Sequence, residues 1–331
     1  MENQNLSAAL QNLSADYKSL KQEIGQVIVG QDEVIDQLII ALLAKGHCLL
    51  IGVPGLAKTL LIQTLAGVLE LDFSRIQFTP DLMPGDITGT EILDIDPESN
   101  KRSFKFIRGP LFSNLILADE INRTPPKTQS ALLEAMQEKQ ITSSGVRYVL
   151  PQPFFVMATQ NPIEQEGTYP LPEAQLDRFM FSLHLGYPTE KQESEVVKRT
   201  TSGVNAKSKQ VISKAKLEQY QSIIPNMEVS DWLVDRVVRL VNMTRTNSEF
   251  FPLEMKNYIR WGAGPRASQA IISSSKVRAA LLGKSVPDWD DVLFVYKPVL
   301  RHRIVLTFSA EAEGINSDYL LEQLAGKMDT K

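Results

Sequence analysis

One segment of the chain has the residue types and spacing of a phosphate-binding loop. Residues 52–59 read GVPGLAKT; they follow the apolar run 48–51 and precede an apolar, helix-like run. A glycine-rich loop between a strand and a helix turns backbone N–H groups and the positive end of the helix dipole toward a polyphosphate. In this pattern Lys58 contacts the β- and γ-phosphates, and the hydroxyl of Thr59 binds Mg²⁺. The segment therefore predicts a polyphosphate site.

The loop departs from the general pattern at one position, and the motif has a simpler alternative. Ala57 stands where the general pattern has glycine. An alanine needs a backbone angle that a Cβ atom permits, so we expect the loop to differ slightly from its commonest form. An ordinary Gly/Pro turn between a strand and a helix would look similar in sequence. Residues further along the chain favour the phosphate-binding interpretation.

Two carboxylates and one amide follow two other apolar runs. Asp119 and Glu120 come directly after residues 115–118, and Asn161 follows residues 154–158. Such runs are typical of buried parallel strands, whose carboxyl ends form the ligand-binding edge of a sheet. We expect Asp119 to hold the Mg²⁺ shell, Glu120 to orient the attacking water, and Asn161 to hydrogen-bond the γ-phosphate or that water. The simpler alternatives are a helix cap for the two carboxylates and an Asn-Pro turn for Asn161.

Two arginines could act on the charge that develops during hydrolysis. Arg178 lies in the segment 171–179, LPEAQLDRF, and Arg266 begins a predicted helix. Phosphoryl transfer spreads negative charge over the γ-phosphoryl oxygens, and a guanidinium brought to that charge is worth roughly 10³–10⁵ in rate. Either arginine could instead form a surface ion pair, worth less than about 1 kcal/mol.

The elements that must position these residues alternate between strands and helices. Strands are predicted at residues 48–51, 74–78, 115–118 and 154–158, and helices at 7–24, 32–43, after Lys58 and at 127–138. This alternation predicts an α/β fold of three layers with a parallel sheet. Alternating patches near 91–107 and across 140–150, the second turning at residues 143–145, predict two inserted hairpins.

The pattern changes near residue 187. From residue 189 onward the chain shows helical periodicity and no convincing pair of strands. We therefore expect a core domain over residues 1–187, including the N-terminal helix, and a smaller all-α domain over residues 188–331.

Composition sets limits on the class of protein. The 331 residues are 43% hydrophobic and 22% charged, which is typical of a globular protein, and the length favours two domains. The net charge of −4 gives no general attraction to a nucleic-acid backbone.

Cys48 is the one cysteine and fits a core position better than a nucleophile. The longest apolar run, residues 38–44, is too short to cross a bilayer, and no signal segment is evident, so we expect a cytoplasmic protein without membrane insertion.

Together these segments resemble the MoxR family of AAA+ ATPases. The resemblance is carried by residues 52–59, 118–123 (ADEINR), 158–162 (ATQNP), 171–179, 264–267 (GPRA) and 299–304 (VLRHRI). It extends from residues 29–31 (VGQ) to about residue 305, and Ala57 agrees with this family's version of the loop.

The resemblance implies ATP and Mg²⁺ as ligands and assigns roles to individual residues. It places Val29 and Gly30 against the adenine, Asn161 as the sensor-1 residue, and Thr59 and Asp119 at the metal. It implies that Arg266, the sensor-2 residue, reaches its own subunit's nucleotide, whereas Arg178 is the arginine finger that acts on the neighbouring subunit's ATP. The other nucleotide-binding residues are those of the loop and the start of its helix: Gly52, Pro54, Gly55, Leu56, Ala57, Lys58 and Leu60.

The resemblance also implies a biological role. It indicates a homo-oligomeric ring, a hexamer, that acts as a chaperone-like remodeller or activator of partner proteins, possible partners being those with von Willebrand factor A domains. A magnesium-chelatase-like motor subunit and a nucleic-acid motor are the alternatives. Arg123 is a further candidate for facing the neighbour, and the basic cluster Lys297, Arg301, His302 and Arg303 is either an interface or a solvated face.

Overall fold

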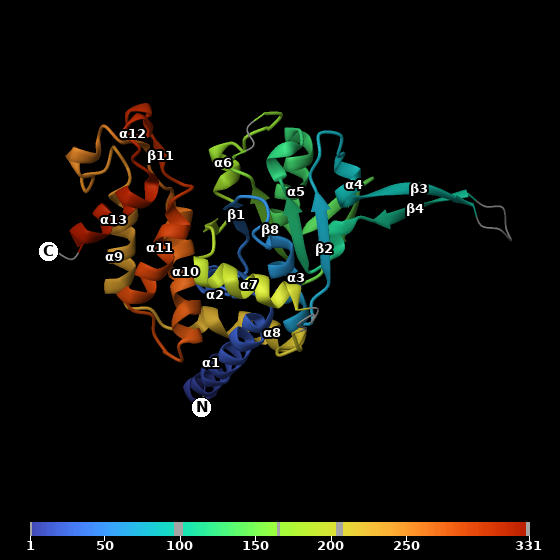
Figure 1. The fold of residues 1–331 in the computed structure, drawn as a ribbon, viewed down its shortest axis with the longest axis horizontal. Coiled ribbons are helices and arrows are strands. Elements are labelled where there is room, and N and C mark those ends of the chain that lie inside the picture. The colour runs from blue at the N-terminus through green and yellow to red at the C-terminus, as the bar shows by residue number, and fades with distance from the viewer. Residues whose placement is uncertain (1, 96–101, 164–165, 203–207, 329–331) are drawn as a thin grey trace.

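The computed structural model describes residues 2–95, 102–163, 166–202 and 208–328 of the chain. A core built on a parallel sheet lies beside a mainly helical lid, and one long hairpin projects from the core away from the lid (Figure 1). The positions of the candidate site residues follow from how the sheet is ordered and where the lid docks on it.

The central sheet has five parallel strands in the order β2-β5-β8-β1-β9. Their bounds are β1 (Cys48–Gly52), β2 (Phe73–Gln77), β5 (Leu115–Asp119), β8 (Phe155–Gln160) and β9 (Phe181–Leu185). Alternate side chains of the three inner strands enter two separate apolar clusters, because successive residues of a strand point to opposite faces. One cluster includes Leu50, Leu117 and Met157, and the other includes Leu49, Ile116 and Val156. Both faces of the sheet are covered, which confirms the predicted three-layer core.

Helices of the core follow the predicted pattern closely. They are α1 (Glu2–Val27), α2 (Asp32–Leu43), α3 (Lys58–Val68), α4 (Pro84–Thr88), α5 (Pro126–Glu138) and α6 (Glu173–Leu176), with 3₁₀ turns η1 (Pro110–Phe112) and η2 (Ile121–Arg123). α5 begins with a proline in its first turn, a position where the missing N–H costs no helical hydrogen bond. α2 is almost wholly buried and lies next to β9 and the lid helix α10 (Pro265–Leu281).

Two hairpins are inserted into the core, as predicted. β3 (Gly89–Ile95) pairs with β4 (Arg102–Arg108), and β6 (Gln140–Ser143) pairs with β7 (Val146–Val149). The turn of the second hairpin has Ser144 and Gly145 at positive φ, which matches the twist of its strands. The hairpins are joined, since Phe106 stacks on Tyr148 with ring centroids 4.2 Å apart. Ser144 Oγ also donates to Glu91 Oε2 over 2.8 Å.

After β9, the described part of the chain is helical apart from one short strand pair. Its helices are α7 (Glu190–Thr201), α8 (Lys214–Ile223), α9 (Asp231–Asn242), α10, α11 (Trp289–Leu300), α12 (Phe308–Ala312) and α13 (Ser317–Met328), with 3₁₀ turns η3 (Ile224–Asn226) and η4 (Leu253–Met255). β10 (Ile259–Trp261) and β11 (Val305–Leu306) form an antiparallel pair that the sequence did not predict. Strands of three and two residues are too short to show an alternating pattern.

The division at residue 187 stays a prediction, and the structure adds how the segment after it packs. α8 lies against α1 and α2, and Gln221 on α8 donates to the carbonyl of Leu42 over 2.7 Å. The first elements after β9 thus pack on the core, whereas α9 to α13 make up the lid seen at the left of Figure 1. Among the described residues, no helix has the length and apolar character needed to span a membrane.

His47 anchors the amino end of β1 to its neighbours. The backbone N–H of Val156 donates to Nδ1 over 3.1 Å, so Nε2 carries the proton and donates to the carbonyl of Met136 over 3.3 Å. Burial lowers the pKa of His47 to about 4. In a protonated ring both nitrogens would be donors, so Nδ1 could no longer accept the N–H of Val156.

A pH dependence of stability follows from this histidine. Unfolded chains bind a proton at His47 below about pH 6.5, whereas the folded chain does so only near pH 4. Stability is therefore retained above pH 6.5 and declines as the pH falls, by up to about 1.4 kcal/mol per pH unit for this group. Urea unfolding between pH 7 and pH 5 should show this slope, and His47→Gln should reduce it. An unchanged slope in the variant would contradict the assignment.

Candidate functional site

The predicted phosphate-binding loop connects the buried strand β1 to the helix α3. Lys58 is half-buried, and its Nζ donates to the carbonyl of Gly52 over 2.8 Å, across the loop itself. Burial lowers the pKa of Lys58, and the charges of Asp119 and Glu120 oppose that shift, which places both carboxylates near the amine. The structure thus gathers the lysine, the loop carbonyl and the two carboxylates at one place.

The backbone of the loop adopts conformations that favour small residues. Ala57 has φ 55° and ψ 27°, inside the small left-handed region that residues with a Cβ atom can enter at a cost of about 1–2 kcal/mol. Gly55 has a φ of 85°. A Cβ atom on Gly52 would lie 2.9 Å from Cβ of Leu185 on the adjacent strand. The alanine therefore occupies a left-handed position of the kind glycine usually fills.

The segment predicted to contact adenine lies beside the loop. Nε2 of Gln31 donates to the carbonyl of Leu56 over 3.2 Å, which ties this segment to the loop. Gly30 has a φ of 76°, and a Cβ atom there would lie 2.4 Å from the Gln192 side chain on α7. Val29 is half-buried next to it. The segment that holds Val29 and Gly30 therefore contacts both the loop and α7, and its role at the adenine stays a prediction.

Asp119, the last residue of β5, is held by two neighbouring strands. Thr159 Oγ1 on β8 donates to Asp119 Oδ1 over 2.7 Å and accepts the backbone N–H of Glu120 over 2.9 Å. Arg75 on β2 forms an ion pair with Asp119 Oδ2 over 2.7 Å. Neither partner was predicted as a site residue: Thr159 lies within the 158–162 motif but was given no role there, and nothing in its local pattern marks Arg75. Carboxylate and hydroxyl oxygens are the ligands Mg²⁺ prefers, so Asp119 and Thr59 fit the metal.

Glu120 lies in a left-handed backbone conformation with φ 58° and ψ 51°. Its Oε2 accepts from Gln77 Nε2 over 3.0 Å and from Arg123 Nη1 over 3.1 Å. A carboxylate accepts at both oxygens, so Oε1 can still accept from a water molecule. Arg123, a candidate for facing the neighbour, thus pairs with Glu120 of its own chain. Gln77, at the end of β2, is a further site residue that the sequence analysis did not identify.

Asn161 follows β8 directly and is buried. Its Oδ1 accepts the backbone N–H of Ile163 over 3.1 Å, which is the Asn-Pro turn considered as the alternative. That contact fixes the amide orientation, because an N–H can donate only to the oxygen. The turn uses Oδ1 and leaves the donor Nδ2 for a hydrogen bond to a phosphate or water. The Asn-Pro turn and the predicted sensor role are therefore compatible.

These residues share one edge of the sheet. Strand pairing sets Ile51 opposite Gln160, Ala118 opposite Ala158, and Gln77 opposite Asp119. The loop, Asn161, the two carboxylates and Gln77 therefore form a row along the carboxyl ends of β1, β8, β5 and β2. This is the edge where open parallel sheets bind ligands.

Arg178 and Arg266 lie at the opposite edge. Phe181 at the start of β9 pairs with Cys48 at the start of β1, so Arg178, three residues earlier, lies at the amino edge. Arg178 Nη1 donates to the carbonyl of Leu133 over 2.6 Å. Arg266 and Arg178 both line a cavity of about 180 Å³ that also includes His47, the residue before β1.

The position of Arg266 corrects the expectation that it reaches its own subunit's nucleotide. The five residues of β1 separate the two edges by about 16 Å, at about 3.3 Å per residue. A guanidinium at the amino edge cannot cross that distance to the loop of its own chain. The physical reason is the docking of the lid against the start of β9 rather than over the phosphate loop.

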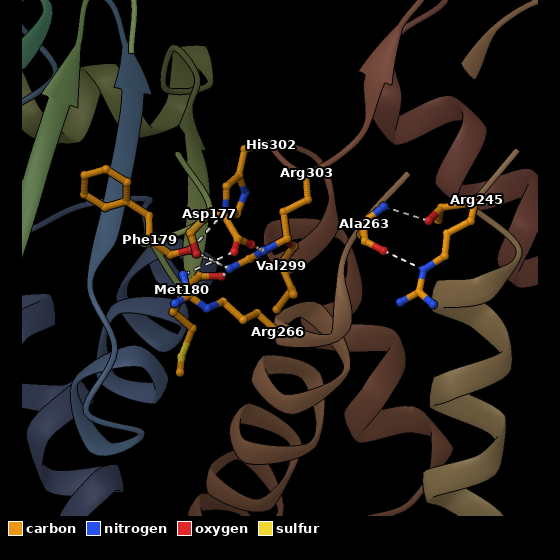
Figure 2. Close-up of polar contacts among 10 residues, drawn as sticks. Asp177, Phe179, Met180, Arg245, Ala263, Arg266, Val299, His302 and Arg303 are labelled. Carbon is orange, nitrogen blue, oxygen red and sulfur yellow. Dashed lines mark hydrogen bonds and ion pairs between the residues drawn. The ribbon is translucent and has the colours of Figure 1, made fainter. Parts of the chain in front are cut away.

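Two residues of the basic cluster, His302 and Arg303, contact the core of the same chain (Figure 2). The Arg303 side chain is only 4% exposed and pairs with Asp177. His302 has its pKa well below its usual value because of burial, so its ring is neutral and Nε2 donates to the Phe179 carbonyl over 3.0 Å. Arg301 binds Asp318 and the Ser182 carbonyl, and Lys297 pairs with Glu322. Arg301, His302 and Arg303 thus form an interface within the chain, whereas Lys297 forms its ion pair inside the lid.

Comparisons with known proteins agree with this architecture. The sequence model described as the ATPase family associated with various cellular activities (AAA) matches residues 47–181, and that of the AAA lid domain matches residues 254–324. The chain is 44% identical to Chaperone MoxR1 of Mycobacterium tuberculosis, over 95% of this chain and 83% of that protein. It is 40% identical to the uncharacterised protein YeaC of Bacillus subtilis, over 92% and 91%. A crystal structure of a candidate ATPase from Cytophaga hutchinsonii superposes with a TM-score of 0.91 at 42% identity, covering 99% of this chain and 98% of the other.

The matched regions coincide with the two parts of the structure that carry the site. The AAA match begins at His47 and ends at Phe181, which spans the phosphate loop, both carboxylates, Asn161 and Arg178. The lid match contains Arg266 and Arg303. The chain therefore belongs to the MoxR family of AAA+ ATPases.

Proposed function

We propose that this protein hydrolyses ATP to ADP and phosphate with Mg²⁺, in a homo-oligomeric ring, a hexamer, whose nucleotides lie between adjacent subunits. The observation that supports the proposal is the division of the site residues between two edges of one sheet. The phosphate loop, Glu120 and Asn161 share the carboxyl edge, whereas Arg178 and Arg266 share the amino edge. Neighbouring copies that place one edge against the other would complete each site.

Each residue has a role that its position supports. Lys58 neutralises charge on the β- and γ-phosphates, and the N–H groups of the loop bind phosphate oxygens. Thr59 and Asp119 would hold Mg²⁺, which supplies electrostatic stabilisation of the developing charge. Glu120 orients the attacking water and accepts its proton, and Asn161 donates a hydrogen bond from Nδ2. Arg178 and Arg266 of the adjacent subunit stabilise the transition state from the opposite side.

The output of this chemistry is motion between subunits. Loss of the γ-phosphate removes the charge that Arg178 and Arg266 of the neighbour bind, so the contact between the two subunits weakens. We propose that this motion remodels or activates partner proteins, including partners with a von Willebrand factor A domain. The name of the Mycobacterium tuberculosis relative, a chaperone, supports a chaperone-like role. Action in the cytoplasm stays a prediction from the sequence.

The two alternative motors would use the same pocket. A magnesium-chelatase-like subunit and a nucleic-acid motor differ from the proposed remodeller in what they move, not in how they cleave ATP. In the described hairpins, Phe106 and Tyr148 stack on each other, so they do not form an open platform for bases. A DNA-stimulated ATPase rate would favour the nucleic-acid motor over the remodeller.

Dependence of turnover on protein concentration tests the shared pocket. The ATPase rate per subunit should rise as the protein assembles and fall to the level of Lys58→Ala at dilutions where sedimentation shows only monomer. The reason is that a monomer has no arginine from a neighbour in its pocket. Equal turnover by monomer and assembly would overturn the proposal.

A further inference from the structure

We infer that Arg303 is a positioning residue for the neighbouring subunit's pocket, because it fixes Asp177 and so holds Arg178 and Arg266 together as one unit. The inference rests on the proposed function, in which both arginines act on the ATP of the adjacent subunit. It extends that function by naming the buried group that aligns them.

The guanidinium of Arg303 uses all of its donors on the segment around Arg178 and on the last turn of α11. A guanidinium has five N–H donors in a fixed planar arrangement. Nε donates to Asp177 Oδ1 over 2.7 Å, and Nη2 donates to the carbonyls of Asp177 and Phe179 over 3.2 and 2.8 Å. Nη1 donates to the Met180 carbonyl over 3.1 Å and to the Val299 carbonyl. Five donors thus meet five acceptors, a set that the three donors of a lysine cannot satisfy.

This arrangement clamps the backbone on both sides of Arg178. The acceptors include the residue before Arg178 and the two residues after it, all held by one lid side chain that is 4% exposed (Figure 2). Arg178 itself extends to the Leu133 carbonyl on α5. The direction in which Arg178 leaves the core is therefore set by a residue that lies 126 positions from Asp177 in the sequence.

Asp177 links Arg178 to Arg266. Its Oδ1 binds Arg303, and its Oδ2 lies 3.5 Å from Nη1 of Arg266. The charge of Arg266 is close enough to Arg303 to oppose the protonated state of that buried arginine. Asp177 therefore lies between two guanidiniums of the lid and balances them at the edge that also carries Arg178. Without this carboxylate, the two like charges of the lid would face each other uncompensated.

The backbone that leads to Arg266 is fixed as well. Arg245 Nε donates to the carbonyl of Ala263 over 2.8 Å, and Thr244 Oγ1 accepts the N–H of Ala263 over 3.0 Å (Figure 2). A Cβ atom on Gly262 would lie 2.2 Å from the Thr244 carbonyl, so this close approach requires glycine. α10 thus begins at a fixed point, and the side chain of Arg266, 59% exposed, extends from there.

A mixed-ring assay tests the positioning role. Arg178→Ala subunits keep an intact loop but have no finger, and Lys58→Ala subunits keep the finger but have no loop lysine. Only an interface that combines the loop of an Arg178→Ala subunit with the finger of a Lys58→Ala subunit can be active. We expect Arg303→Lys in the Lys58→Ala subunit to lower kcat of the mixture by about tenfold or more, since a displacement near 1 Å can cost up to about 10²-fold. The same change in the Arg178→Ala subunit should alter kcat less than twofold, and KM for ATP should stay the same in both.

Arg301→Lys in the Lys58→Ala subunit is the matched control. Arg301 also joins lid to core, through the Ser182 carbonyl, but does not contact Asp177. If the loss of kcat comes from the contacts of Arg303 with residues 177–180 and not from lid docking in general, this control should leave kcat unchanged. Should Arg303→Lys fail to assemble, Asp177→Asn placed in either subunit should give the same asymmetric loss.

The outcomes separate this inference from the proposed function. An inactive mixture of the two parent variants would refute the shared pocket, and the positioning role with it. An active mixture that Arg303→Lys weakens equally from either subunit, or from neither, would overturn the positioning role alone.

Discussion

Replacing Arg178 with alanine is expected to lower the ATPase rate by roughly 10³–10⁵-fold, the range for losing an arginine that contacts the transferring phosphoryl group. ATP binding should persist, because Arg178 lies at the amino edge of the sheet, about 16 Å from the loop of its own chain. Steady-state hydrolysis and equilibrium binding of a fluorescent ATP analogue would measure the two properties on the same preparation.

An ATPase assay on mixtures of two variants distinguishes a residue that acts on the pocket of its own subunit from one that acts on the neighbour's pocket. Arg178→Ala and Lys58→Ala should each be inactive alone, and a mixture should regain part of the activity at interfaces that carry an intact loop and an intact arginine. Arg266→Ala mixed with Lys58→Ala should behave in the same way, because Arg266 lies beside Arg178. If mixing never restores activity with Arg178→Ala, that residue is not a finger for the adjacent subunit.

Glu120→Gln is expected to keep ATP affinity and lower turnover by about 10²–10⁴-fold, the usual contribution of general-base catalysis. The amide keeps the size of the carboxylate and can still accept from Gln77 and Arg123, so the pocket should keep its shape. It cannot take a proton from water. Single-turnover hydrolysis with saturating enzyme would measure the chemical step separately from product release.

A matched control for that variant is Glu218→Gln on the exposed side of α8, which should leave turnover unchanged. Unchanged hydrolysis by Glu120→Gln would remove Glu120 as the base. Lost ATP binding would instead indicate that the negative charge of Glu120 holds the loop in place, through its effect on Lys58.

The carboxyl-edge half of the site could be predicted from the sequence. Asp119 and Asn161 each follow a run of apolar residues, and the ends of neighbouring parallel strands must lie at one edge. Local pattern was enough, because each side chain is positioned by its own strand. The two hairpins were predictable for the same reason, since alternation and a serine-glycine turn are local features.

Positions that depend on contacts between distant segments could not be predicted. The place of Arg266 depends on how the lid docks at the start of β9, and that docking rests on Arg303 and Asp177, far apart in the sequence. Gln77 is a site residue because β2 pairs with β5, and no neighbour in sequence marks it. The motifs indicated which residues belong to the site. Only the packing of the lid shows that Arg266 lies at the amino edge of the sheet.

The stacking of Phe106 on Tyr148 has a mechanical consequence. β6 continues directly from α5, and α5 also provides the Leu133 carbonyl that receives Arg178. The β3–β4 hairpin is therefore coupled through the stacked rings to β7 and its partner β6, and so to α5. Force applied to that hairpin is expected to reach α5, whose Leu133 carbonyl accepts from Arg178.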